Sequence, residues 1–182
     1  TSLGGSYTLE GWVNPDTIGG TLFAIFSKPL IADPTNNEGN ETNLYINPAG
    51  GIGFGVGLDG GTSTSFGVAS PTSPSLLTAG EWAHVAAVVD DTAKTITVYV
   101  NGVAGTPASY AGHTLSAGSL PLEIGHFDNS TPANERYFDG QMADMRVWSE
   151  ARTSEEINAD MHDFVPSGSN GLVANWQMND AA

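Results

Sequence analysis

The chain has 182 residues, of which 40% are apolar, so it is long enough for one well-buried core and too short to suggest two domains. Twenty acidic residues against five basic ones give a formal net charge of −15, which excludes a binder of the nucleic-acid backbone because such a partner rewards a basic face. The absence of cysteine excludes disulfides and thiolate sites. No apolar run is long enough to span a bilayer, so we expect no transmembrane segment and one globular domain over residues 1–182.

Alternating or short apolar runs predict a series of β-strands through the first half of the chain. The predicted strands are Ser6–Asn14, Thr21–Ser27, Asn43–Asn47, Ile52–Leu58 and, more weakly, Ser63–Val68. Clusters of Pro, Gly, Asn and Asp separate these runs, as turns require. The first half therefore indicates β-structure without a helix.

The second half continues this pattern and adds one helix. Its predicted strands are Glu81–Asp90, Thr95–Asn101, Leu120–Gly125, Gln141–Trp148 and Gly171–Met178. The helix begins after Thr153, whose hydroxyl can accept from the amide of Glu156 while the Glu156 side chain returns to the Thr153 amide, a capping box. Ile157 and Met161, four residues apart, supply its apolar stripe. Many strands, one short helix near the C-terminus and no strand–helix alternation predict an all-β, antiparallel β-sandwich.

Several segments carry a family likeness in both order and spacing. They are SYTLEGWVNP, FSKP, GEWAHVAAVVDDTAKTITVYVNG, LEIGHF, FDGQMADMRVWSEARTSEEI and the closing GLVANWQMND. Together they resemble the laminin-G-like domains of the concanavalin A-like jelly-roll superfamily and, more distantly, the pentraxins. The resemblance covers nearly the whole chain and implies a jelly-roll fold. It implies less about function, because this fold hosts lectins, adhesion modules, toxin domains and glycosidases.

The chain departs from the family at its beginning. Members usually carry an additional edge strand with a Phe-Asp-Gly-x-Asp-Asp-like motif ahead of the position where this chain opens, at TSLGGSYTLE. Either the chain has been shortened there or its C-terminal strand takes that edge. A metal ligand that the motif would supply is not expected here.

Catalysis is not expected. Glycosidases that resemble this fold place paired carboxylates on alternate residues of one strand, so that acid and nucleophile share a face. Here the strand carboxylates each stand alone, at Glu10, Glu81 and Glu123. His84 lies inside an apolar strand, where we expect a structural role, and Arg146 is expected to pair with Glu10 or Asp144. No Gly-x-Ser-x-Gly or His-Glu-x-x-His motif occurs, so the sequence predicts a non-catalytic domain.

Two polar loops, over residues 28–42 and 126–139, carry the Asp, Asn and Glu oxygens that Ca²⁺ takes in groups of six to eight. In pentraxins the calcium and ligand site is built from two loops in matching places. By that resemblance the metal-ligand candidates are Glu41, Asn43, Asp128 and Glu135. Neither loop matches an EF-hand pattern, and the alternative that both are plain hydrophilic connections stays open.

Aromatic side chains beside these loops suggest a platform on which a sugar ring can pack. The ligand-binding candidates are Asn40, Phe127, Asn129 and Tyr137. Trp12 shares a strand face with polar residues, so we expect it to be partly exposed. The other tryptophans, Trp82, Trp148 and Trp176, are expected to pack in the core.

These observations favour a non-catalytic, calcium-assisted carbohydrate-binding module of a bacterial surface or secreted protein. We expect an extracellular location, with a glycan or surface polysaccharide and neighbouring domains of a parent chain as partners. Two alternatives stay open. One is a structural or protein-binding adhesion module, and the other is an accessory domain of a larger glycosidase or protease.

Overall fold

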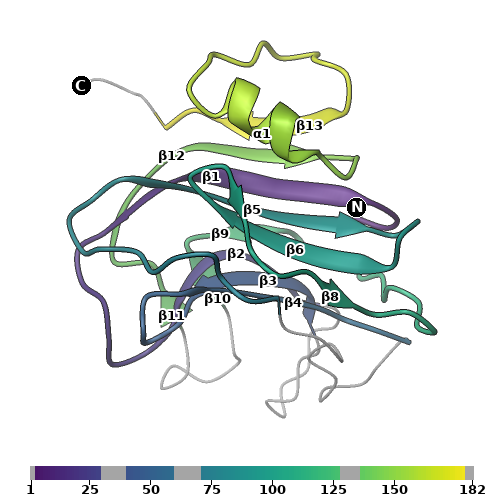
Figure 1. Cartoon of the computed structure of the whole chain (residues 1–182), viewed down its shortest axis with the longest axis horizontal. Coiled ribbons are helices and arrows are strands. Elements are labelled where there is room, and N and C mark those ends of the chain that lie inside the picture. The colour runs from purple at the N-terminus through teal and green to yellow at the C-terminus, as the bar shows by residue number, and fades with distance from the viewer. Residues whose placement is uncertain (1–2, 30–39, 60–70, 128–135, 179–182) are drawn as a thin grey trace.

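The computed structural model describes residues 3–29, 40–59, 71–127 and 136–178 (Figure 1). The strands before the midpoint are β1 (Tyr7–Pro15), β2 (Phe23–Pro29), β3 (Asn40–Ile46), β4 (Ile52–Val56) and β5 (Ala83–Asp90). Next come β6 (Thr95–Val100), β7 (Val103–Ala104), β8 (Ala108–Ser109), β9 (Glu123–Ile124), β10 (His126–Phe127) and β11 (Arg136–Tyr137). The chain continues with β12 (Gly140–Trp148), helix α1 (Ser154–Asp160) and β13 (Leu172–Trp176). The weakly predicted strand over residues 63–68 lies outside the described residues.

The strands form an antiparallel β-sandwich, as the sequence predicts. The larger sheet has the order β13–β12–β1–β5–β6–β7, with β8 also pairing with β6, and the smaller sheet has the order β4–β3–β2–β9. Strands β10 and β11 form a separate pair. In Figure 1 the larger sheet is the middle layer, the smaller sheet lies below it and α1 lies above. The C-terminal strand β13 takes the edge of the larger sheet beside β12.

One core fills the space between the sheets. Its fully buried members come from alternate positions of the central strands, among them Leu9, Val85, Val98, Leu44 and Phe54. Burying each such side chain stabilises the fold by about 1.5–3 kcal/mol. The period-2 alternation that predicted these strands is therefore the pattern that builds the core.

A close approach between β1 and β12 explains one glycine. A β-carbon at Gly11 would overlap the Met145 sulfur, so only glycine lets Met145 enter the core at this point. The register of β1 against β12 shifts between Glu10 and Trp12, and Asp144 adopts a positive φ of 49° beside this irregularity.

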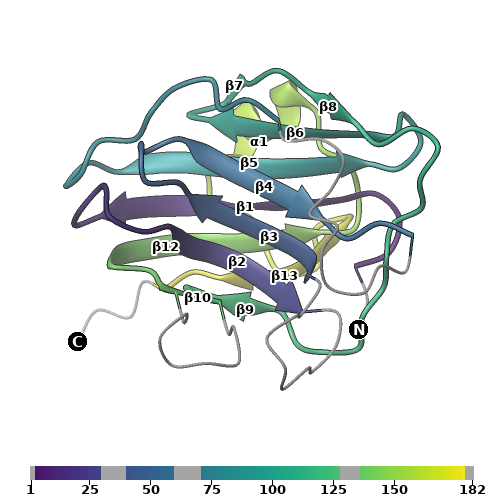
Figure 2. The ribbon, with the colours of Figure 1, turned by 90° about the horizontal axis from the view of Figure 1, so that it is seen from below.

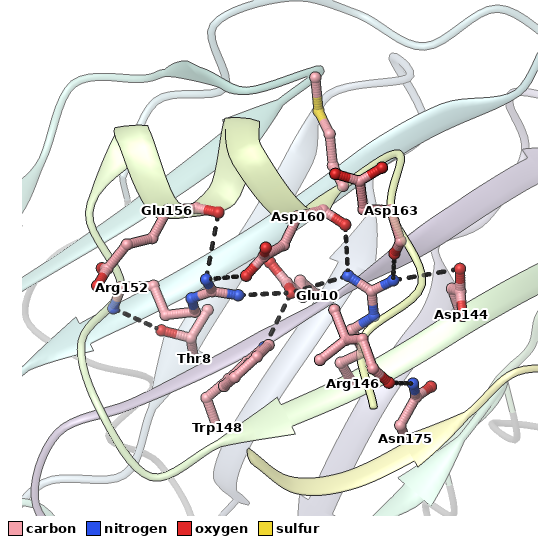
Figure 3. A network of polar contacts seen from close by, with 12 residues as sticks. Thr8, Glu10, Asp144, Arg146, Trp148, Arg152, Glu156, Asp160, Asp163 and Asn175 are labelled. Atoms are coloured by element: carbon pink, nitrogen blue, oxygen red, sulfur yellow. Dashed lines mark hydrogen bonds and ion pairs between the residues drawn. The ribbon is translucent and has the colours of Figure 1, made fainter. Parts of the chain in front are cut away.

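Helix α1 is fixed to the outer face of the larger sheet by buried charges (Figure 3). The Glu10 carboxylate accepts a hydrogen bond of 2.8 Å from Trp148 Nε1, and the Arg152 and Arg146 guanidiniums lie 3.4 Å and 3.7 Å from it. Arg146 also donates to the carbonyl oxygens of Asp160 and of residue 163, at 2.8 Å and 2.9 Å. These bonds join β1, β12 and the C-terminal end of α1.

Two predictions about polar side chains are confirmed in this region. The capping box is confirmed, because Glu156 N donates to Thr153 Oγ1 at 3.2 Å and Thr153 N donates to Glu156 Oε2 at 2.8 Å. Arg146 pairs with both expected carboxylates, since Asp144 lies 3.3 Å from it in addition to Glu10.

The tryptophan predictions are confirmed in part. Trp12 is half-buried as expected, and its Nε1 donates to the Met161 carbonyl at 2.7 Å. Trp148 is buried, but between the larger sheet and α1 rather than between the sheets. The core assignment is wrong for Trp82, 44% exposed, and for Trp176, 41% exposed. Trp82 precedes the first residue of β5 and Trp176 ends the edge strand β13, so each lies where the sandwich stops.

No described helix is long and apolar enough to cross a membrane, and α1 itself has seven residues.

Candidate ligand-binding face

The outer face of the smaller sheet carries a line of polar side chains across its strands. Asn43 on β3 lies opposite Ser27 on β2, and Ser27 lies opposite Glu123 on β9. The next residues along, Leu44 and Ile124, pack in or against the core, so the three polar side chains point away from it. Directly opposed residues have their β-carbons about 4.5–5.5 Å apart. Figure 2 shows this sheet in front of the larger one.

The line continues onto the β10–β11 pair. Gly125 adopts a positive φ of 72° between β9 and β10, a conformation that glycine allows and that redirects the chain. His126 Nδ1 then lies 3.1 Å from Glu123 Oε2. The His126 ring stacks on Tyr137 with centroids 4.7 Å apart and planes inclined by 18°. We call these five residues, Asn43, Ser27, Glu123, His126 and Tyr137, the polar row.

Exposure is low at the β2–β3 end of the polar row and high at the β10–β11 end. Ser27 and Asn43 are 0% and 3% exposed, the side chains of Glu123 and His126 are 27% and 29% exposed, and Tyr137 is 58% exposed. The polar row therefore has a closed end at β2–β3 and an open end at β10–β11.

Four atoms of the polar row are buried without a hydrogen-bond partner in the structure. They are Ser27 Oγ, Asn43 Oδ1, Glu123 Oε2 and His126 Nε2; the contact between His126 Nδ1 and Glu123 lacks hydrogen-bond alignment. An unsatisfied buried polar atom costs about 1–3 kcal/mol, so native proteins usually satisfy such atoms with water, ions or ligands. Their concentration on one face marks it as a candidate binding site.

Strand β4 brings two glycines beside the polar row. Its glycines, Gly53 and Gly55, lie opposite Tyr45 and Asn43. A β-carbon at Gly53 would overlap the Tyr45 ring, so that ring lies across the strand at this position. Burial raises the pKa of the Tyr45 hydroxyl. The result is a surface with an aromatic ring and no side chain from β4 at these two positions.

The metal-ligand candidates are separated in the structure. Glu41 is buried: its Oε1 accepts from Leu3 N at 2.6 Å, and its Oε2 accepts from Gly118 N at 2.6 Å and lies 2.7 Å from Lys28 Nζ. These contacts give Glu41 a structural role, and its assignment to calcium stays a prediction. Asn43 is in the polar row. Asp128 and Glu135 lie outside the described residues.

The ligand-binding candidates also differ in accessibility. Tyr137 is exposed in the polar row, whereas Phe127, which lies opposite Arg136 in the β10–β11 pair, is buried. Asn40 begins β3, but its side chain lies outside the described part of the chain, as does the whole of Asn129.

Sequence reasoning missed Ser27, Glu123 and His126. A signal exists for Glu123, a polar residue between the apolar Leu122 and Ile124, which therefore faces outward. Ser27 lies between Phe26 and Lys28 and gives no such signal. The pairing that brings Ser27 and Glu123 together joins β2 to β9, which are far apart in the chain. No local sequence pattern predicts the register of β2 against β9.

A second concave region lies at the edge of the larger sheet. It has a volume of about 500 Å³ and is mainly apolar. Its lining includes Leu3, Tyr7, Leu122, Val147, Val173 and Trp176. Val173 and Trp176 are exposed on the edge strand β13, so this apolar cleft is open to solvent.

Comparisons with solved structures show the same fold in carbohydrate-binding proteins. A candidate carbohydrate-binding protein from Bacteroides ovatus is 21% identical with a TM-score of 0.73; the match covers 100% of this chain and 47% of that one, so this chain spans about half its length. A SAP-like pentraxin from Limulus polyphemus is 22% identical with a TM-score of 0.64, covering 97% and 81% of the two chains. The CBM40 of the Ruminococcus gnavus IT-sialidase, bound to α2,3-sialyllactose, is 15% identical with a TM-score of 0.66, covering 87% and 83%.

At these identities the likeness shows the fold alone. A search of curated proteins found no significant match. The sequence pattern of one family matches residues 1–158, which include both sheets up to β12 and most of α1. The chain belongs to the concanavalin A-like lectin/glucanase superfamily.

Proposed function

We propose that the protein is a non-catalytic glycan-binding module and that the polar row is its binding site. The observation that carries this proposal is the set of four unpartnered polar atoms beside the exposed Tyr137 ring. The superfamily and the carbohydrate-binding neighbours support it. A secreted or surface location follows from the same proposal, because polysaccharides and cell-surface glycans lie outside the cell.

The open end of the polar row would meet the sugar. Tyr137 offers a ring held in place by its stack on His126, and an apolar sugar face can pack on such a ring. Hydroxyl groups of the same sugar would donate to the Glu123 carboxylate, whose side chain is 27% exposed. The ring and the acceptors are already in place, which reduces the entropic cost of binding.

The closed end would hold Ca²⁺. Asn43 Oδ1 and Ser27 Oγ are two oxygens without hydrogen bonds, and oxygen is the ligand that Ca²⁺ prefers. Among the described residues no cluster of three or more His, Asp or Glu side chains occurs, so the remaining ligands would come from Asp128, Glu135, backbone carbonyls or water. Calcium would fix the closed end and thereby position Glu123 for the glycan.

The absence of catalysis belongs to the same proposal. Glycoside hydrolysis uses two carboxyl groups on either side of the scissile bond. In the described part of the polar row Glu123 has no second carboxylate beside it, and its nearest charged neighbour is His126. This geometry favours binding over hydrolysis.

The test is retention on a panel of immobilised glycans, in calcium and in chelator. Tyr137→Ala should weaken binding of any positive glycan by about tenfold or more, because the exposed ring is lost while the core is untouched. Phe164→Ala is the matched control, since Phe164 is exposed to a similar degree on another part of the surface. If no glycan is retained in either condition, the proposal is wrong; hydrolysis of a retained glycan would overturn its non-catalytic part.

The apolar cleft favours one alternative, a contact with a neighbouring protein domain. Exposed apolar groups such as Val173 and Trp176 commonly mark interaction surfaces. If that contact is the main function, Trp176→Ser should abolish partner binding while glycan binding stays absent.

A further inference from the structure

We infer that the glycan is neutral and is recognised through its hydroxyl donors, and that sialylated or sulfated glycans are rejected. This inference rests on the proposed function and specifies its ligand class. It follows from two independent observations on the polar row, the hydrogen-bonding character of its free atoms and the location of every basic residue in the chain.

The polar row offers hydrogen-bond acceptors to a ligand. At the open end, the Glu123 carboxylate can only accept hydrogen bonds. His126 Nδ1 lies 3.1 Å from Glu123 Oε2 without hydrogen-bond alignment, so its unpartnered Nε2 serves as an acceptor in one tautomer and as a donor in the other. A matching ligand must therefore supply donors, which sugar hydroxyls do and ionised carboxylates and sulfates do not.

No lysine or arginine offers a charge to this face. The chain has five such residues, all within the described ranges. Lys28 is buried against Glu41, Lys94 pairs with Asp91 at the β5–β6 turn, and Arg146 and Arg152 are buried beneath α1.

Arg136 is the fifth basic residue and the nearest in sequence to the polar row. It lies opposite Phe127 in the β10–β11 pair, whereas Tyr137 lies opposite His126. Successive side chains on a strand point to opposite faces, so Arg136 faces away from the Tyr137–His126 stack. Proteins commonly recognise carboxylates and sulfates with arginine, and the polar row has none.

The flanking sequence adds charge of the wrong sign for an anion. Residues 30–39 and 128–135 contain Asp33, Glu38, Asp128 and Glu135 and no lysine or arginine. They join directly to β2, β3, β10 and β11. A like-charged ligand loses affinity for a chain with a net charge of −15. The sialyllactose held by the CBM40 relative is thus the kind of ligand that this chain should discriminate against, although the fold is shared.

The experiment compares neutral glycans with their own sialylated or sulfated derivatives on the same panel, at neutral pH and physiological salt. We expect each bound neutral glycan to be held at least about tenfold more tightly than its charged derivative, in calcium and in chelator alike. Glu123→Gln should lower the ratio of the affinity for the neutral glycan to that for its charged derivative, because it removes the carboxylate and adds an amide donor. Glu81→Gln removes the same charge at an exposed site outside the polar row and should leave the ratio unchanged.

Two results would overturn the inference. Equal or tighter binding of the charged derivative, including binding that requires calcium as a bridge, would refute the neutral preference and leave glycan binding intact. Binding of neither class would remove the proposed function and this inference together. The wild-type comparison decides the matter without any variant, and the two variants assign the preference to Glu123.

Discussion

At the scale of single residues, Glu10 organises the outer face of the larger sheet. Its side chain is fully buried, with Arg152 and Arg146 at 3.4 Å and 3.7 Å and a hydrogen bond from Trp148. Burial raises the pKa of Glu10, and the Trp148 hydrogen bond and the two guanidiniums oppose that rise. Removing the carboxylate would leave two buried guanidiniums short of a counterion, which costs far more than the intact group contributes.

Glu10→Gln should therefore lower the free energy of unfolding by about 3 kcal/mol or more. Urea denaturation at pH 7 measures this directly. Glu81→Gln is the control, because an exposed carboxylate should change stability by no more than about 0.5 kcal/mol. Similar small changes in the free energy of unfolding for both variants would show that the Glu10 carboxylate contributes little to stability.

His84 gives the fold a measurable pH dependence. Burial, with Arg146, His162 and Arg152 nearby, lowers its pKa from the usual 6.5 to about 3, and Glu10 lies 4.0 Å from its Nε2. The folded protein therefore holds a neutral imidazole, while the unfolded chain binds a proton below pH 6.5. The stability that this provides is present above pH 6.5 and is lost as the pH falls toward 3.

Between pH 6.5 and 5 the free energy of unfolding should fall more steeply for the wild type than for His84→Gln. The difference in slope should approach about 1.4 kcal/mol per pH unit, the value for one proton. Urea titrations at three pH values in this range measure it, and the subtraction removes the contribution of the other histidines. Equal slopes would mean that His84 titrates normally in the fold.

At the scale of elements, α1 depends on its two ends. A helix of seven residues is unstable alone, since isolated helices shorter than about 12–15 residues are marginal in water. The capping box satisfies amides at its first turn, and its last turn contains no basic residue. Arg146 on β12 supplies a positive group there by donating to the Asp160 carbonyl, which also suits the helix dipole.

Thr153→Ala should lower the free energy of unfolding by about 1 kcal/mol, because the cap hydroxyl no longer accepts from the Glu156 amide. Thr153→Ser should retain most of the wild-type stability, since serine caps helices equally well. Chemical denaturation of the three proteins measures the difference. A serine variant as unstable as the alanine variant would show that the methyl group, not the hydroxyl, stabilises the helix.

The elements that could be predicted from the sequence are those with local signals. The capping box places Thr153 and Glu156 three residues apart, and β5 and β6 are joined by a tight turn that sets their register. Trp176 was assigned to the core because an apolar edge strand has the same alternation as a central one. The residues around Trp176 do not indicate that β13 lies at the edge of the sheet.

Of the polar row, only Asn43 and Tyr137 could be proposed from the sequence. Tyr137 was identified because it flanks a polar loop, and Asn43 because of the family resemblance. The partners of Asn43 in the polar row depend on the β2–β9 pairing, which is a tertiary property. Glu41, chosen for the same chemistry, lies against Lys28, and that burial is likewise not readable from sequence.

At the scale of the whole molecule, the net charge of −15 is the dominant feature. The chain has five basic residues for 20 acidic ones, so most of its negative charge is not neutralised by lysine or arginine. Repulsion among the acidic groups destabilises the compact state, and salt reduces it over a screening length of about 8 Å at physiological ionic strength.

Raising NaCl from about 10 mM to about 300 mM should therefore increase the melting temperature. CaCl₂ at matched ionic strength should increase it further, because an ion that binds only the native state adds stability by mass action. MgCl₂ is the control, since Mg²⁺ demands a smaller octahedral site. Identical curves for all three salts would show screening alone and would contradict the calcium proposal, and Asn43→Ala should remove any excess seen with calcium.

Helix α1 also makes the two faces of the sandwich different. With α1 and its buried charges fixed on the outer side of β1 and β12, that side of the larger sheet is closed, while the smaller sheet presents the polar row on the opposite side (Figures 1 and 2). Binding would then depend on orientation as well as affinity. Copies tethered with α1 toward a surface would display their binding sites outward. Copies tethered the other way round would have the polar row against the surface and would not bind ligand.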